Sequence, residues 1–392
     1  MKHLLLALTL MISLIGGTVQ AQTLSRNVAT RVYQAYELQS NDHNDKAIKI
    51  LQNISTSRVY DTSVVQRMLG ILYWQQKQTH LAEKALFKAV EANGLPVEQH
   101  LETLRMLADI QLSNGHTRSA IKTYHEIIAQ NNTHKIIAIN AIQQVWLRIA
   151  QGNYQLQQWQ PVIDATNKYV ALGGAPQVSV LNLRLGAELS LQKWHSALKT
   201  TLALRGLEPD IARWWVQTIN LYLQTENYPQ ALAAMKQYQR AGFTLTEAQR
   251  RMMAQLYSKQ NVPLKAAEVF HALNKADNTQ AKDLAIEAQY WQQARAWDKS
   301  LKAWARATAK DSKYRWSYIQ LLMQNKQYKT ALTQLKKQKT SSRTELTSVE
   351  AYYRLGDIPN ALRHAQKANQ INSTPSTINW VKYLTQLSGV RS

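Results

Sequence analysis

The most regular feature of the chain is a short phrase in which an aromatic or branched residue is followed by two variable residues, a small residue and leucine. The phrase occurs five times, as WHSAL at 194–198, YPQAL at 228–232, WDKSL at 297–301, YKTAL at 328–332 and IPNAL at 358–362. A catalytic group is needed once, so a phrase that recurs this often indicates packing rather than chemistry.

The phrases are regularly spaced, and together with Trp159 most of them follow one another at intervals of 30 to 35 residues. One interval is twice as long and holds a related segment at 263–270, and the small residue has counterparts upstream at Ala47, Ala82 and Ala120. A period near 34 residues is typical of a repeat built from two helices. We therefore predict helix pairs, with each phrase at the start of the second helix and its small residue where two helices approach closely.

Three longer segments show the fuller pattern of apolar, small and turn residues. They are MLGILYWQQKQTHLAEKALFKAVEANGLP at 68–96, LADIQLSNGHTRSAIKTYHEIIAQN at 107–131 and AYYRLGDIPNALRHAQKA at 351–368. On these segments the chain resembles the tetratricopeptide repeat family, in about ten degenerate units over roughly residues 28–375. The resemblance implies an all-α, right-handed superhelical solenoid in which the first helix of each pair lines a concave surface.

The repeats divide the chain into a solenoid over residues 22–375 and a C-terminal capping helix and tail over 376–392, because a solenoid needs a polar end. No linker of low complexity separates two domains within the array. The longest interval, from Ala120 to Val162, and the loop signal GGAPQ at 173–177 mark the least regular part.

The first 21 residues have the pattern of a cleaved signal peptide. Lys2 and His3 precede an apolar run that ends at Gly16, and Val19 and Ala21 occupy the positions that signal peptidase reads. The run is short for a membrane anchor, because a spanning helix needs about 20 apolar residues. The sequence has no Cys, which excludes a lipoprotein and any disulfide. We therefore expect a protein of the bacterial periplasm.

The charge is strongly basic, with 47 Lys and Arg against 25 Asp and Glu and a net charge of +22. Such a charge favours nucleic acid, anionic membrane or acidic protein partners. Export removes nucleic acid from these classes. We expect no stable membrane insertion after cleavage of the signal peptide, whereas peripheral association and the oligomeric state stay open.

Motifs that carry chemistry are missing from the sequence. It has no H-E-x-x-H, no G-x-S-x-G, no phosphate-binding loop and no Cys nucleophile. His116 and His125 could share a helical neighbourhood, but two histidines are more simply surface residues. The sequence therefore predicts a protein that is not an enzyme and binds neither a cofactor nor a metal.

Basic and aromatic residues on the first helix of several pairs are the candidate binding residues. Arg can bind carboxylates through two hydrogen bonds, and Trp can supply a binding hot spot, so such a face suits an extended peptide. The predicted partner-binding residues of the concave groove are Arg67, Trp74, Arg105, Arg213, Arg251, Lys259, Lys282, Trp316 and Arg354.

These features support a periplasmic scaffold or adaptor that binds an envelope protein in its basic groove. The whole chain is similar to periplasmic tetratricopeptide proteins associated with TonB energy-transduction systems, which implies a component of such a transport system. The alternative is binding of an anionic polymer or a membrane surface, as in polysaccharide or peptidoglycan machinery. A repeat-scaffolded enzyme would need acidic or His residues to converge in the fold.

Overall fold

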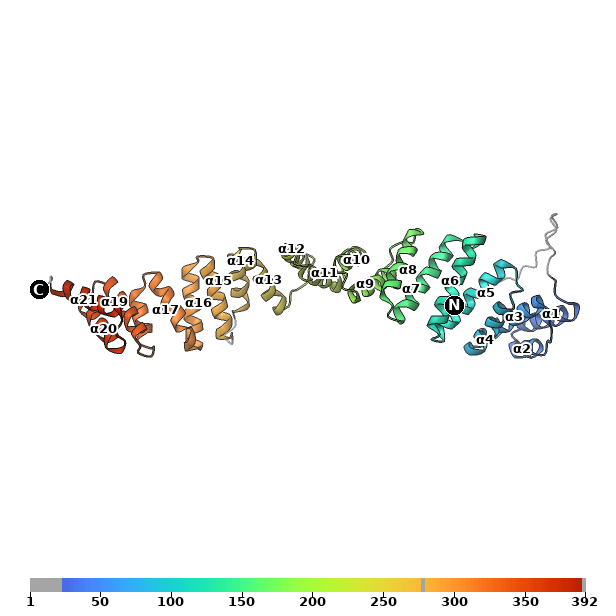
Figure 1. Cartoon of the computed structure of the whole chain (residues 1–392), viewed down its shortest axis with the longest axis horizontal. Helices are drawn as coiled ribbons and strands as arrows, with labels where there is room; N and C mark the ends of the chain where they lie inside the picture. Colours follow the sequence, from blue (N-terminus) through green and yellow to red (C-terminus); the bar gives the residue numbers. More distant parts are fainter. Residues whose placement is uncertain (1–22, 276–278, 390–392) are drawn as a thin grey trace. The chain divides into compact units, whose positions relative to one another are not determined.

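The computed structural model describes residues 23–275 and 279–389. Every regular element in these residues is helical, so the chain is all-α, with 21 α-helices and one short 3-10 helix. The helices form two compact units, one that ends at Leu207 and one that starts at Glu208. Figure 1 shows the helices in chain order, coloured from blue to red.

The first unit contains five helix pairs. Its helices are α1 (Arg26–Ser40), α2 (Asn44–Gln52), α3 (Val59–Gln75), α4 (Thr79–Ala92), α5 (Val97–Ser113), α6 (Thr117–His134), α7 (Ile139–Gln155), α8 (Trp159–Ala171), α9 (Val178–Ser190) and α10 (Trp194–Leu207).

The second unit contains five further pairs and one last helix. Its helices are α11 (Ala212–Gln224), α12 (Tyr228–Arg240), α13 (Glu247–Lys259), α14 (Pro263–Leu273), α15 (Ala281–Gln293), α16 (Trp297–Lys310), the 3-10 helix η1 (Ser312–Tyr314), α17 (Arg315–Gln324), α18 (Tyr328–Leu335), α19 (Ser342–Arg354), α20 (Ile358–Ile371) and α21 (Pro375–Gly389).

Within each unit every helix packs on the next, as in a tetratricopeptide solenoid, which confirms the predicted fold class. The repeated phrases begin α10, α12, α16, α18 and α20, as predicted from their spacing. Helix α21 lies in the segment predicted as the cap and packs on α20. The predicted signal peptide lies outside the described residues. None of the described helices is both long enough and apolar enough to cross a membrane.

The fourth residue of every even-numbered helix up to α20 is fully buried, with an exposed fraction of 0%. These ten residues are Ala47, Ala82, Ala120, Val162, Ala197, Ala231, Ala266, Ser300, Ala331 and Ala361. Most are small, so the two helices of a pair can approach closely without a void. The aromatic residues that open the phrases are half-buried, and Trp297 and Tyr228 pack against the neighbouring core.

The turn inside each pair has one geometry. The residue two positions before each even-numbered helix is in the left-handed region, with φ between 54° at Gln192 and 81° at Gly115. The N–H of the following residue donates to a carbonyl five residues back in all ten turns, as in His116 to Gln111. This is the Schellman arrangement that satisfies carbonyls at a helix end. Of the ten turn residues, Gly115 and Gly356 are the two glycines.

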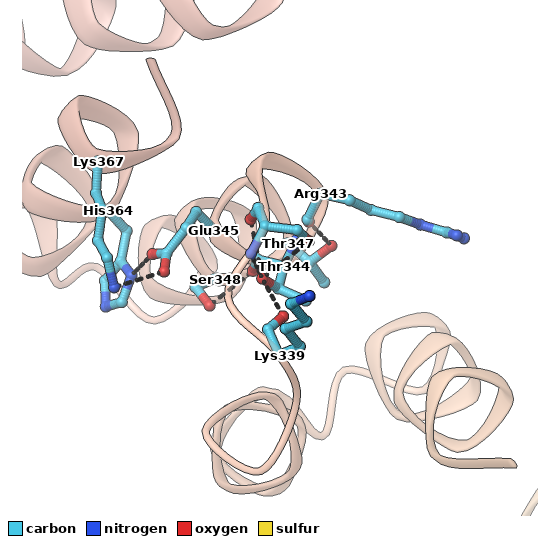
Figure 2. Close-up of polar contacts among 9 residues, drawn as sticks. Lys339, Arg343, Thr344, Glu345, Thr347, Ser348, His364 and Lys367 are labelled. Carbon is cyan, nitrogen blue, oxygen red and sulfur yellow. Dashed lines mark hydrogen bonds and ion pairs between the residues drawn. The ribbon is translucent and has the colours of Figure 1, made fainter. Parts of the chain in front are cut away.

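A buried carboxylate joins the two helices of the last pair. Figure 2 shows His364 and Lys367 of α20 pointing at Glu345 of α19. Lys367 Nζ lies 2.8 Å from one carboxylate oxygen, and His364 Nδ1 is hydrogen-bonded to the other. Burial raises the pKa of Glu345, but the hydrogen bonds from Lys367 and His364 outweigh it and hold the pKa below its ordinary value. The charge of Glu345 is therefore part of the packing between these helices.

The irregular interval after Ala120 has a local cause. Helix α6 is 18 residues long and ends at His134, and Lys135, which caps it, has a φ of 52°. The Asn131 side chain then accepts a hydrogen bond from the Ile137 N–H at 2.7 Å and holds the short connection to α7. The extra length thus lies in one helix and its connection, and α6 still packs on α7.

Candidate functional site

The first unit has a groove between α5 and α7, which we call the α5–α7 groove. It consists of two adjoining cavities of about 380 and 530 Å³ that share Asp109 and Arg148. One cavity is lined by Arg105, Asp109, Tyr124, Asn140, Ala141, Gln144, Val145 and Arg148. The other is lined by Asp109, Leu112, Ser113, Arg148, Gln151, Tyr154, Gln155 and Leu183.

Asp109 connects the two walls of the groove. Its carboxylate accepts a hydrogen bond from the buried Tyr124 hydroxyl of α6, and it lies 3.6 Å from Arg148 Nε of α7. Burial and the contact with Asp109 raise the pKa of Tyr124 well above its usual range, so the phenol keeps its proton. About half of the Asp109 and Arg148 side chains remains exposed, so both can also meet a ligand.

The α7 wall carries a stripe of amides and one guanidinium. Spacings of four, four, three and four residues place them on one face of the helix. The stripe is Asn140, Gln144, Arg148, Gln151 and Gln155. The Gln144 side chain is exposed and forms no hydrogen bond within the described chain, whereas the Gln155 side chain accepts one from Thr117.

On the α5 wall, Arg105 is exposed and has no ion pair with any described residue. A free guanidinium can donate two hydrogen bonds to a carboxylate, and amide side chains can both donate to and accept from a peptide backbone. The α5–α7 groove therefore offers what an extended, acidic peptide segment requires. Leu112 and Tyr154 add half-exposed apolar surface at one end.

Nine residues are predicted from the sequence to bind a partner, and all nine lie on odd-numbered helices. Arg105 is the one that lines the α5–α7 groove. Trp74 on α3 is 55% exposed, so its indole is accessible to a partner. Three of the nine belong to the first unit and six to the second.

Three of the nine are held by contacts within the chain. Arg67 of α3 pairs with Glu102 of α5 at 3.0 Å, and 13% of its side chain is exposed. Arg251 of α13 donates two hydrogen bonds to Asp283 of α15, at 2.7 and 2.9 Å, and two more to Glu247. The hydrogen bonds to Asp283 and Glu247 raise the pKa of Arg251. These two arginines tie successive repeats together.

Trp316 is the third such residue. Its half-buried indole packs against a core formed by Ile319, Leu332 and Leu335, and the guanidinium of Arg343 lies 3.9 Å from its ring centre. Trp316 therefore contributes to the packing of α17, α18 and α19, and little of its ring faces solvent.

The remaining four predicted residues are exposed in the second unit. Arg213 lies 4.0 Å from the ring centre of Trp214, and Lys259 Nζ lies 3.6 Å from that of Tyr228. Lys282 on α15 and Arg354 on α19 are exposed and form no side-chain hydrogen bond within the described chain. Whether these residues bind a partner stays a prediction.

None of the residues predicted from the sequence belongs to the α7 stripe. The irregular interval after Ala120 obscured the repeat there, so residues 139–155 supplied no candidate. The signal is nevertheless present, because Asn140, Gln144 and Arg148 recur at the helical spacing that selected the other candidates. No three His, Asp or Glu side chains gather to hold a metal ion in the part of the chain that the structure describes.

No family model and no curated protein matches the chain. Among solved structures, it is similar to a tetratricopeptide repeat protein from Parabacteroides merdae, at 12% identity and a TM-score of 0.37, over 69% of this chain and 100% of that one. It is also similar to Naa15/Naa10 bound to HypK-THB, at 12% identity and a TM-score of 0.43, over 90% of this chain and 65% of that one.

A third similar structure is the TPR2AB domain of yeast Sti1 in complex with pHSP90, at 14% identity and a TM-score of 0.29, over 79% of this chain and 96% of that one. Because all three TM-scores are below 0.5, the fold is assigned from the ten helix pairs and their common turn.

Proposed function

We propose that the chain is a scaffold of the bacterial periplasm that binds an extended, acidic segment of a partner protein in the α5–α7 groove. The observation that supports this most is the free Arg105 guanidinium opposite the amide stripe of α7. In our proposal the partner belongs to a cell-envelope complex, and a TonB-type transport system is the assembly that the sequence favours.

The binding step needs no bond to be made or broken. Arg105 pairs with a carboxylate of the segment, while Gln144 and Asn140 bond its backbone. Asp109 keeps Arg148 and Tyr124 in place, so the groove is preorganised and less free energy is spent on ordering side chains. Specificity comes from the match between the charge of Arg105 and an acidic residue of the segment.

Crosslinking in cells tests this function. A photoreactive residue at Gln144 should capture one envelope protein, and the crosslink should map to an acidic, extended segment of it. Adding Arg105→Ala should reduce capture about tenfold or more, because a charged hydrogen-bonded pair is lost. A photoreactive residue at Lys122, exposed on the outward side of α6, is the matched control and should not capture it. Equal capture from both positions would contradict groove binding.

Localisation is tested separately. N-terminal sequencing of the protein from the periplasmic fraction should begin at Gln22, one residue after the predicted cleavage site. A chain that begins at Met1 or stays in the cytoplasm would contradict the periplasmic part of the proposal and leave the groove itself to the crosslinking test.

A further inference from the structure

The second unit has a densely basic region that is separate from the α5–α7 groove. Residues 299–343 contain twelve Lys or Arg and one carboxylate, Asp311. That carboxylate is engaged by Lys313 at 2.8 Å. Six lysines of this region are exposed and form no side-chain hydrogen bond or ion pair within the described chain: Lys302, Lys326, Lys329, Lys336, Lys337 and Lys339.

Four of these charges lie on the exposed side of α16. On α16, Lys299, Lys302, Arg306 and Lys310 follow one another at spacings of three, four and four residues, and all four are exposed. The opposite side of the helix, with Leu301, is in the core. The solvent-facing side of α16 therefore carries four basic residues and one carboxylate, Asp298, at its start. Arg306 also donates a hydrogen bond to the Asn274 carbonyl at 2.8 Å, and Lys299 Nζ lies 4.5 Å from the ring centre of Trp291.

A second group of lysines surrounds α18, one pair later. Lys329 lies on the helix, Lys326 lies in the left-handed turn before it, and Lys336 and Lys337 follow its last residue; all four are exposed. Ala331, on its inner side, enters the same core as the inner face of α16. The inner faces of α16 and α18 thus share one core, and both groups of basic residues are exposed. We call these two groups the lysine face; it consists of Lys299, Lys302, Arg306, Lys310, Lys326, Lys329, Lys336 and Lys337.

The composition of the lysine face indicates what it can bind. Among the described residues no large hydrophobic side chain is exposed between Leu264 and Leu355. A protein interface normally has apolar or aromatic anchors at its centre and few lysines. A specific sugar site would also use stacked aromatic rings, and no exposed aromatic ring lies among these described residues. Lysine is a strongly hydrated point charge that suits a diffuse layer of anions.

We propose that the lysine face docks the protein on the surface of a membrane rich in anionic phospholipid. The charges lie on two helices and at both ends of α18, so they cover an area rather than a line, as a layer of head groups requires. Each lysine near such a surface strengthens binding by about fivefold. No apolar side chain is available to insert, so the association is peripheral and sensitive to salt.

Vesicle sedimentation tests the proposal with the mature full-length chain. The protein should pellet with vesicles of phosphatidylcholine and phosphatidylglycerol in equal parts and stay in solution with phosphatidylcholine alone. Raising the salt concentration should release it, because charges are screened over about 8 Å already at physiological ionic strength. Failure to pellet with the anionic vesicles at low salt would overturn the proposal.

A pair of matched variants separates this surface from net charge. K326Q/K329Q/K336Q should weaken vesicle binding about a hundredfold, from about fivefold per lysine. K84Q/K88Q/K122Q removes the same charge from exposed positions on α4 and α6 and should change binding by less than about twofold. Equal loss in both variants would overturn the proposal, because net charge would then explain the binding.

Two further experiments distinguish membrane binding from binding of soluble polyanions and from binding in the α5–α7 groove. Binding to soluble polyglutamate or heparin without binding to vesicles would overturn the membrane assignment in favour of an acidic protein or glycan. The groove variant R105A/Q144A should bind vesicles like the wild type, which distinguishes this proposal from groove binding. Unchanged far-UV circular dichroism of both triple variants would establish that they fold.

Discussion

The α5–α7 wall of the first unit and the α13–α15 wall of the second begin from the same pattern, an arginine on the first helix of a pair. Arg105 lies across the α5–α7 groove from the amide side chains of α7 and has no ion pair with a described residue, so the groove remains open. The guanidinium of Arg251 donates two hydrogen bonds to Asp283 of α15. One arginine is left for a ligand, and the other joins two repeats.

Whether each arginine is paired depends on the residue that stands opposite it in the next repeat. Arg67 and Glu102 are 35 residues apart, and Arg251 and Asp283 are 32 apart, so each arginine has a carboxylate at its own level on the next odd-numbered helix. At the same offset from Arg105 stands Asn140, which is neutral. Of these three arginines, only Arg105 has no carboxylate at this offset, and it is the one that stays available.

The largest difference in stability should come from substituting Trp316 and Trp74, which the sequence predicts alike as partner-binding residues. Trp316→Ala removes a ring that packs between three helices and should lower the free energy of unfolding by about 3 kcal/mol. Trp74→Ala removes an exposed ring and should change it by less than about 0.5 kcal/mol. Urea denaturation followed by far-UV circular dichroism measures both. Equal effects would mean that exposure does not separate the two rings.

A charge reversal should give the next largest effect. Arg251→Glu sets a third carboxylate beside Asp283 and Glu247 and should destabilise the second unit by about 2 kcal/mol, because the pair is partly buried. Arg105→Glu should leave stability within about 0.5 kcal/mol of the wild type, because no described residue pairs with Arg105. Urea denaturation again checks both. A stable Arg251→Glu variant would show that Arg251 is as free as Arg105.

The smallest expected change in the free energy of unfolding concerns two buried carboxylates, Glu345 in the second unit and Asp61 in the first. Because the folded-state pKa of Glu345 is lowered, its contribution is complete above the unfolded-state pKa of glutamate, about 4.3, and is lost as the pH falls through the folded-state pKa. Glu345→Gln should cost about 1 kcal/mol at neutral pH, and the difference from the wild type should shrink on acidification. Urea denaturation at a series of pH values measures this.

Asp61 of the first unit is the control for that experiment. Burial raises its pKa, but hydrogen bonds from the Ser25 side chain and backbone outweigh burial and hold the pKa below its ordinary value. Arg58 also lies 3.9 Å from Asp61, but it lowers the pKa less than the two Ser25 donors do. Hydroxyl and amide donors are less sensitive to salt than the cations around Glu345. Added salt should therefore reduce the cost of Glu345→Gln more than that of Asp61→Asn. The reverse order would contradict the cationic account of Glu345.

Much of the fold follows from the sequence, because the second helix of each pair repeats its own pattern. Ala82 and Ala231 mark the point of close approach, and Tyr228 and Trp297 mark the helix start, at the places where the structure has them. Each helix pair must pack on its neighbours in the same way, so these positions carry similar residues in most repeats.

The candidate site follows less well, because a groove depends on pairs of residues from different repeats. Arg67 and Arg251 satisfy the same one-helix pattern as Arg105, and only their partners on the next odd-numbered helix distinguish them. Gln144 and Arg148 lie where the longer α6 shifts the period, so the stripe was not in register with the other repeats. Comparison of each first helix with the next would have found both.

The common left-handed turn also bears on how the array can change in length. Each turn is closed by hydrogen bonds within its own helix pair, as at Lys77 and Gln157, so a whole pair could be duplicated or lost with no new turn to invent. The α5–α7 groove is different, because Asp109 and Arg148 belong to successive pairs. A pair inserted between them would leave every turn intact and dismantle the groove, so scaffold and binding surface can evolve separately.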